Sequence, residues 1–154
     1  MTDARLKFLI ETVELEAQHL NQTDQRLFIR AFDVVRATAL RSNVDEAERV
    51  DAFVARFGRL QDTLGDKLLP HLLQALAEPT GPAIDNLDRA EKLGLLKSTD
   101  DWMTGRRLRN RMVHEYVRDA GDLATALNEA HALVPLLTGF ATTVIGFCRT
   151  RGMY

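Results

Sequence analysis

Cysteine is almost absent from this chain of 154 residues, and its scarcity limits both cross-linking and metal binding. Cys148 is the single cysteine, so no disulfide can form within the chain, and no Cys and His residues have the spacing of a structural zinc site. We therefore expect no metal and a reducing compartment, which indicates a cytoplasmic protein. We also expect Cys148 to be a core residue.

Long apolar segments that would export or anchor the chain are also lacking. Residues 1–10 alternate charged and apolar side chains, whereas a signal peptide needs a basic start followed by an unbroken apolar stretch. The longest apolar run, residues 133–148, contains Pro135, two glycines and several threonines. It falls short of the about 20 residues that cross a bilayer, so we expect a buried helix and no contact with a membrane.

An excess of one sign of charge is missing as well. The formal net charge is -2, with 45% hydrophobic and 27% charged residues, which is the balance of an ordinary globular domain and predicts one domain over residues 1–154. A nearly neutral chain has no long-range attraction for nucleic acid, so any RNA binding needs a local basic patch. Such a patch is formed by Arg106, Arg107, Arg109, Arg111 and Arg118, interrupted only by Glu115.

The alternating pattern of a β-strand is not found, and apolar residues recur instead every three to four positions, as in amphipathic helices. We predict a first helix over residues 2–20, a second that begins at Thr23 or Asp24 and runs through Leu40, and a third that begins at Asp45. Pro70 should kink or divide the third, because proline has no amide hydrogen and crowds the preceding turn.

Four breaks divide the second half of the chain. Two prolines and a glycine in residues 78–82 predict a turn, Gly94 ends a short helix over residues 83–93, and Ser98 or Thr99 caps the next one. Residues 119–122 separate that helix from a final helix, which Pro135 bends. The expected fold is all-α, an antiparallel helical bundle of five to six helices.

The helix after Ser98 carries the segment with the most chemistry, residues 109–116, which read RNRMVHEY. A helical residue advances by about 100°, so Asn110 and His114 share one face, and Arg109 and Tyr116 share a neighbouring one. These side chains can donate protons, accept protons and bind phosphate. The segment therefore predicts a catalytic or phosphate-binding site.

Arg109, four intervening residues and His114, with Asn110 directly after the arginine, resemble the Arg-x4-His signature of HEPN-domain ribonucleases. With Tyr116 added, the pattern is similar to that of the HepT toxins of HEPN/MNT toxin-antitoxin pairs, a family also described as nucleotidyltransferase substrate-binding proteins. The similarity extends upstream from Tyr116 through Trp102 to the helix of residues 53–73. It implies the HEPN type of bundle.

The resemblance implies RNA cleavage without a metal or another cofactor, in which a ribose 2′-hydroxyl attacks the adjacent phosphate. His114 would transfer the proton, since an imidazole with a pKa near 6.5 exchanges protons at neutral pH, and this typically contributes about 10²- to 10⁴-fold. Arg109 would stabilise the phosphorane charge through its fixed donors, and Asn110 would orient His114 or the phosphate. In this family, two motif helices meet across a homodimer.

Tyr116 has a different implied role, because in HepT-like toxins this tyrosine accepts adenylyl groups from the partner MNT nucleotidyltransferase antitoxin. Such groups at Tyr116 would block RNA. The chain lacks the Gly-Ser and paired-aspartate pattern of a nucleotidyltransferase, so the modifying enzyme would be a separate protein.

Other interpretations remain open at this stage. The chain can be a noncatalytic subunit that presents substrate to a nucleotidyltransferase or docks against it, or a helical scaffold whose polar motif stabilises its dimer. The arginines can form a solvated face, with Arg111 and Glu115 as an exposed pair worth a few tenths of a kcal/mol. Tyr116 can simply pack its ring, and Trp102 is expected to anchor the core.

Overall fold

The computed structural model describes residues 2–115 and 119–154, and in these ranges every regular element is helical. The third, fourth and fifth elements follow one another without a gap and form one unbroken helix. The described residues therefore form six continuous helical segments, which is an all-α bundle. The predicted fold class is confirmed. The elements are α1 (Ala4–Leu27), α2 (Val34–Ala39), α3 (Val44–Gln61), η1 (Asp62–Leu68), α4 (Leu69–Ala75), α5 (Ala83–Lys92), α6 (Thr99–Glu115) and α7 (Ala120–Thr150).

The first helix is longer than the sequence pattern indicated. Asp3 caps α1 by accepting a hydrogen bond from the Leu6 amide at 2.9 Å, and the helix then runs without interruption to Leu27. The predicted break near Asp24 is wrong because Thr23 and Leu27 continue the buried stripe of α1. The next helix begins after Asp33, nine residues beyond Asp24, and the Asp33 carboxylate caps it by accepting a hydrogen bond from the Arg36 amide. Helix α2 is therefore a single short stretch.

The third helix passes Pro70 by changing its helical type. Asn43 caps α3 two residues before the predicted start at Asp45, and the chain continues through the π-helical stretch η1 directly into α4. In η1 the Leu69 amide bonds to the Leu64 carbonyl, five residues back. This wider turn lies immediately before the proline, which cannot donate a hydrogen bond, so the helix continues where a break or kink was predicted.

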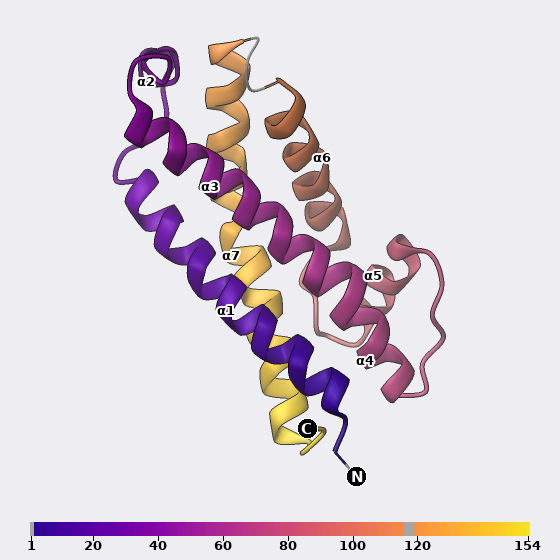
Figure 1. Ribbon diagram of the computed structural model, residues 1–154. Coiled ribbons are helices and arrows are strands. Elements are labelled where there is room, and N and C mark those ends of the chain that lie inside the picture. Colours follow the sequence, from indigo (N-terminus) through magenta and orange to yellow (C-terminus); the bar gives the residue numbers. More distant parts are fainter. Residues whose placement is uncertain (1, 116–118) are drawn as a thin grey trace.

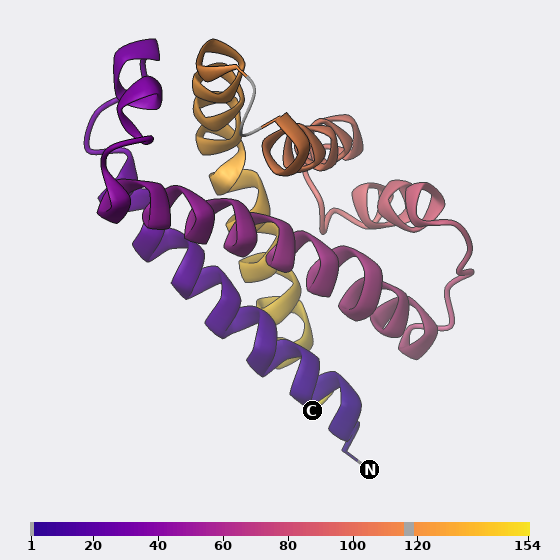
Figure 2. The same ribbon diagram turned by 45° about the horizontal axis from the view of Figure 1, so that its top comes forward.

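The two predicted helix-end signals at Gly94 and Ser98 are confirmed. Gly94 follows α5 with a φ of 76°, which suits glycine, and the Ser98 hydroxyl accepts from the Asp101 amide at the start of α6. Asp119 caps α7 by accepting from the Asp122 amide at 3.1 Å. Helix α7 continues through Pro135 and changes direction part-way along its length (Figure 2).

The last helix is longer than the apolar run that the sequence shows. At 31 residues α7 is long and apolar enough to cross a membrane by length and composition, so the expectation that this segment is too short is corrected. In the fold, 39% of its most apolar window is buried. Leu127, Leu137 and Val144 are among the α7 residues that enter the core.

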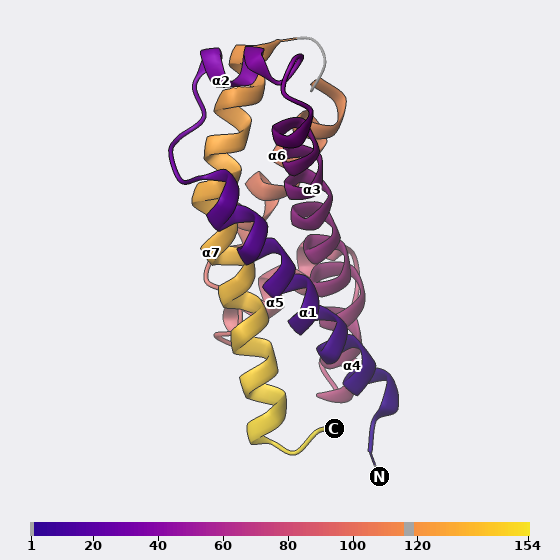
Figure 3. The same cartoon turned by 60° about the vertical axis from the view of Figure 1, so that its left-hand side comes forward.

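The bundle places the motif helix far from the two described ends of the chain. Helices α1 and α3 run antiparallel on one side, and α6 and α7 run antiparallel behind and beside them (Figure 1). Seen from the side, α1 and α7 lie next to each other (Figure 3). In Figures 1 and 3, α2, the C-terminal end of α6 and the N-terminal end of α7 lie at one end of the bundle, and the N and C ends of the chain lie at the other.

Candidate functional site

Helix α6 packs closely on the long α3–η1 helix because glycines stand where the two helices touch. A Cβ on Gly65 would lie 3.2 Å from the Trp102 ring, and one on Gly105 would lie 2.8 Å from the Gln61 side-chain nitrogen. A Cβ on Gly58 would lie 2.8 Å from Nε of Arg109. The two helices thus pack antiparallel over three turns. At each turn a glycine, which has no side chain, allows the neighbouring side chain to approach closely.

Trp102 fixes the buried part of this contact. Its side chain is fully buried, lies edge-on to the Phe140 ring at a centroid distance of 5.3 Å, and covers Gly65. The indole and Gln61 nitrogens have no hydrogen-bond partner among the described residues. The prediction that Trp102 anchors the core is confirmed, and this anchor sets the position of the following turns of α6.

Arg109 lies across Gly58 and reaches an acid of the neighbouring helix. Its two terminal nitrogens lie 3.5 and 3.3 Å from the carboxylate oxygens of Asp62, with both side chains about two-fifths exposed. These are long contacts between half-open groups, so the ion pair contributes at most about 1 kcal/mol. The guanidinium is therefore held in one place without being closed off from a ligand.

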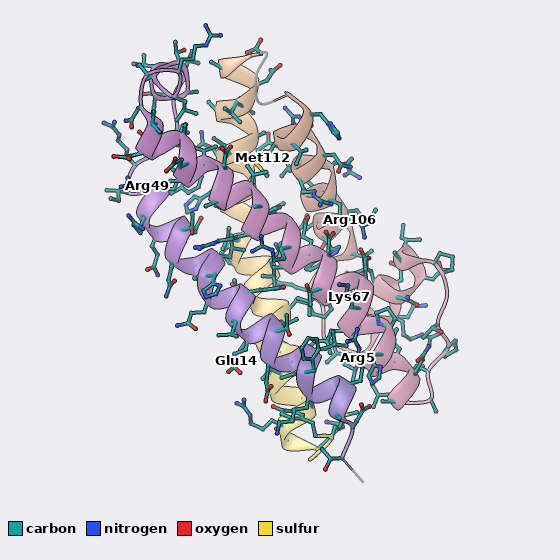
Figure 4. All side chains as sticks on the ribbon, in the orientation of Figure 1. Arg5, Glu14, Arg49, Lys67, Arg106 and Met112 are labelled. Atoms are coloured by element: carbon teal, nitrogen blue, oxygen red, sulfur yellow. The ribbon has the colours of Figure 1, made fainter. Side chains whose placement is uncertain are left out.

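Two further arginines of the predicted basic patch have acidic partners. Arg106 contacts Asp66 at 3.1 Å, and Arg111 contacts Glu129 of α7 at 3.9 Å. Arg107 is exposed and hydrogen-bonds to Thr104. In Figure 4, Arg106 lies on the part of α6 that faces the α3–η1 helix. Acids from other helices therefore offset part of the positive charge that the linear sequence shows.

Asn110 and His114 lie on the exposed face of α6. Neither side chain has a hydrogen bond with any other described residue, so the expected orientation of His114 by Asn110 is not present in the single chain. His114 is five positions after Arg109, which places the two side chains about 140° apart around the helix. Arg109 faces α3, and His114 faces outward, so the structure does not bring these two side chains together within one chain.

A groove opens between α3 and α6 beside Arg109. It has a volume of about 320 Å³, and it is lined on one side by Asp51, Val54, Ala55 and Gly58 and on the other by Arg109, Met112 and Val113. Met112 closes the floor, between the two helices (Figure 4). Arg109 is the one motif residue proposed for catalysis that lines this groove.

Two predicted residues, Tyr116 and Arg118, lie outside the described residues, and so does the side chain of Glu115. No group of three or more His, Cys, Asp or Glu side chains that could hold a metal ion occurs within residues 2–115 and 119–154.

Cys148 is buried in the core as predicted, and burial raises the pKa of its thiol to about 11. The thiolate, which is the reactive form, is therefore disfavoured.

The residues that sequence reasoning missed are Asp62, Asp66 and Asp51. None of them belongs to a motif, because the register between two helices brings them to α6. A signal was nevertheless present: isolated glycines inside a strongly patterned helix, here Gly58 and Gly65, often mark a close approach of a neighbour.

Comparison with family models, with curated proteins and with solved structures finds no match to this chain. The local motif of α6 and the geometry around it are therefore the basis for a functional assignment.

Proposed function

We propose that this chain is a metal-independent endoribonuclease of the HEPN toxin type, acting as a homodimer. The observation that carries the proposal is the division of the motif between two faces of α6. Arg109 is held at the mouth of a groove by Asp62, whereas Asn110 and His114 are exposed and have no hydrogen bond to other described residues. This arrangement leaves a histidine and an amide open to a second copy of the chain.

The division of the motif favours a site shared by two chains. Arg109 and His114 point about 140° apart on one helix, so a single phosphate cannot readily contact both from the same copy. We propose that two α6 helices meet about a twofold axis in such a way that Arg109 of one copy and His114 of the other face the same space. The exposed Arg107 adds positive charge on this side, and the twofold axis doubles it.

The proposed reaction is an internal transfer of the phosphate. The ribose 2′-oxygen attacks the adjacent phosphorus, its proton passes to a base, and the bond to the 5′-oxygen of the next nucleotide breaks as that oxygen gains a proton. The products are a 2′,3′-cyclic phosphate and a 5′-hydroxyl. His114 moves the proton, Arg109 stabilises the added negative charge on the phosphate oxygens, and Asn110 positions the phosphate or the imidazole.

Regulation by a partner completes the proposal. Tyr116 follows His114 by two residues, and adenylylation of its hydroxyl by an MNT-type nucleotidyltransferase would add bulk and negative charge beside the phosphate site. RNA would then be excluded by repulsion and by steric overlap. We assign the chain to the cytoplasm with such a partner, and Arg106, Arg111 and Arg118 to contacts with the RNA backbone.

One observation favours the alternative, a noncatalytic docking subunit of a nucleotidyltransferase. Arg106, Arg109 and Arg111 all contact acids of neighbouring helices, so the cationic surface available to RNA is smaller than the sequence suggests. A docking subunit would keep such ion pairs in its complex, whereas a ribonuclease must exchange the Arg109 pair for a phosphate.

The test is cleavage of total cellular RNA by purified protein with a metal chelator present. We expect His114→Ala and Arg109→Ala each to reduce cleavage by about 10²-fold or more, whereas the exposed histidine variant His19→Ala and the exposed arginine variant Arg149→Ala cleave as the parent does. Equal cleavage by all five proteins would show that a contaminant cleaves the RNA, and the docking subunit would then be the better assignment.

Mixing the two inactive variants tests the shared site. A dimer of Arg109→Ala with His114→Ala retains one intact site if Arg109 and His114 come from different copies, so the mixture should recover about a quarter of the parent activity. A mixture that stays inactive while the two variants exchange subunits would place both residues of each site in one chain.

A further inference from the structure

The groove between α3 and α6 has three kinds of lining in a fixed order. The guanidinium of Arg109 lies at one end beside Gly58, the apolar side chains of Val54, Met112 and Val113 form the middle, and the carboxylate of Asp51 lies at the other end. Positions 51 and 58 are two turns apart on α3, so the groove extends about 10 Å along that helix. This is roughly the length of one extended nucleotide.

The middle of the groove suits a flat, apolar ring. Met112 is buried beneath it, Val54 is nearly buried at its wall, and Val113 is about half exposed at the opposite rim. None of these three side chains carries a hydrogen-bond donor or a strong acceptor. A nucleobase can therefore lie between them on its faces, as unstacked RNA bases do in protein pockets, and only its edge would need polar partners.

Asp51 supplies the polar group at the edge. It is exposed and has no hydrogen bond or ion pair with the other described residues. An ionised carboxylate only accepts hydrogen bonds, through two oxygens side by side. Guanine is the base whose Watson–Crick edge offers two adjacent donors, N1–H and the N2 amino group. Adenine, cytosine and uracil place an acceptor next to their donors, and that acceptor would face the carboxylate.

We propose that the α3–α6 groove binds a guanine base of the RNA substrate, with Asp51 accepting from N1–H and N2–H and Arg109 holding the neighbouring phosphate. This inference rests on the proposed ribonuclease function and adds a substrate preference to it. A guanine nucleotide also matches the charges of the groove. Its anionic phosphate would contact the Arg109 guanidinium, and the hydrogen-bond donors of its base would contact the Asp51 carboxylate.

The experiment measures equilibrium binding to uncleavable RNA. Four fluorescent hexanucleotides with 2′-O-methyl groups throughout, each an adenine tract with G, A, C or U at its third position, are titrated with the parent protein and followed by anisotropy. We expect the G hexanucleotide to bind about tenfold more tightly than the other three, as one bidentate contact to a base typically provides.

Two variants of α3 decide whether Asp51 reads the base. Asp51→Asn replaces one of the two acceptors with a donor, so the preference for G should fall below about twofold. Asp45→Asn makes the same change of charge on the same helix but outside the groove, and it should keep the tenfold preference. Both side chains are exposed, so neither change should affect folding.

The outcomes separate this inference from the function on which it rests. A parent protein that binds all four hexanucleotides equally, or an Asp51→Asn variant that keeps the preference for G, overturns the guanine site even if the protein cleaves RNA. A protein that prefers G among the uncleavable oligonucleotides but leaves the unmodified G oligonucleotide intact overturns the proposed ribonuclease while the guanine site stands.

Discussion

The two halves of α6 rest on the same neighbouring helix but meet it in opposite ways. Around Trp102 and Gly105 the helices are in direct contact, with the indole fully buried and a glycine beneath it. Around Arg109 and Val113 they are separated by a groove of about 320 Å³, and a charged side chain crosses it. One half therefore stabilises the fold, and the other half exposes functional groups at positions that the first half fixes.

The difference arises from the side chains at each turn of the contact. Glycine on η1 leaves room for an indole, which fills the space with apolar atoms and excludes water. Gly58 on α3 leaves room for the aliphatic part of the Arg109 side chain, whose charged guanidinium must reach Asp62 or solvent. The same device, a missing Cβ, thus produces a closed core at one turn and an open site two turns later.

The largest expected effect is a loss of stability when the buried indole is removed from the closed half of α6. Trp102→Ala removes a fully buried indole and leaves a cavity over Gly65, so we expect a loss of about 3–5 kcal/mol in the free energy of unfolding. Chemical denaturation measures it. Val113→Ala, which trims a half-exposed side chain of the open half, should cost less than about 1 kcal/mol. Equal losses for the two variants would contradict the division of α6.

An intermediate effect, on RNA cleavage alone, is expected when a side chain is added beneath Arg109 in the open half of α6. In Gly58→Ala the new Cβ would lie 2.8 Å from Nε of Arg109, so the guanidinium must move away from Asp62. We expect RNA cleavage to fall at least about tenfold, because small displacements of a catalytic group cost that much. The free energy of unfolding should change by less than about 1 kcal/mol, because alanine favours a helix over glycine.

Gly139→Ala is the matched control for this substitution. A Cβ at Gly139 of α7 would meet no atom within 4 Å, so this variant should gain the same helical preference and cleave RNA at the parent rate. If Gly58→Ala also cleaves at the parent rate, the position of Arg109 across Gly58 has no part in the site.

The smallest expected effect concerns a carboxylate of α1 that contacts the same long helix as α6 does, at Thr63 of η1. Burial raises the pKa of Glu16 above its ordinary value of 4.5, although the Thr63 hydroxyl of η1 donates to one of its oxygens at 3.0 Å. The other oxygen is buried without a partner among the described residues. The folded state therefore favours the protonated acid, and the chain loses stability as pH rises through the raised pKa.

Glu16→Gln removes this loss because an amide does not ionise. We expect the Tm at pH 7 to rise by no more than about 3 °C, with a smaller rise at pH 4, where Glu16 is mostly protonated in both the folded and the unfolded chain. Thermal scans at the two pH values check this, with the exposed Glu11→Gln as the control. A gain of equal size at both pH values would show that ionisation of Glu16 is not the cause.

Much of the fold could be predicted from local signals, and its main error has a physical cause. Ser98 caps a helix as its position in the sequence indicated, and Asn43 and Asp119 cap helices at points where the sequence pattern marked only a break. Asp24 also has the form of a cap, but its carboxylate bonds to His131 of α7 at 2.7 Å. A polar residue that serves a tertiary contact cannot be told from a cap without knowing which helix lies opposite.

The candidate site divides in the same way. Arg109, Asn110 and His114 stand out in the sequence because one helix carries them within five residues of each other. Asp62 comes from η1 and Asp51 from α3, and their relation to Arg109 depends on the register of two helices. Asp62 and Arg109 are 47 residues apart in the chain. Sequence reasoning can identify the reactive groups of such a site, but packing determines which counter-charges and walls surround them.

The placement of the described ends has a practical consequence for experiments on this protein. Both the N and C ends lie at the end of the bundle opposite α2 and the N-terminal end of α7 (Figures 1 and 3). A linker attached at either terminus would extend away from the α3–α6 groove. Protein tethered to a sensor surface through such a linker should present the groove to RNA in solution, so binding can be followed on an immobilised sample.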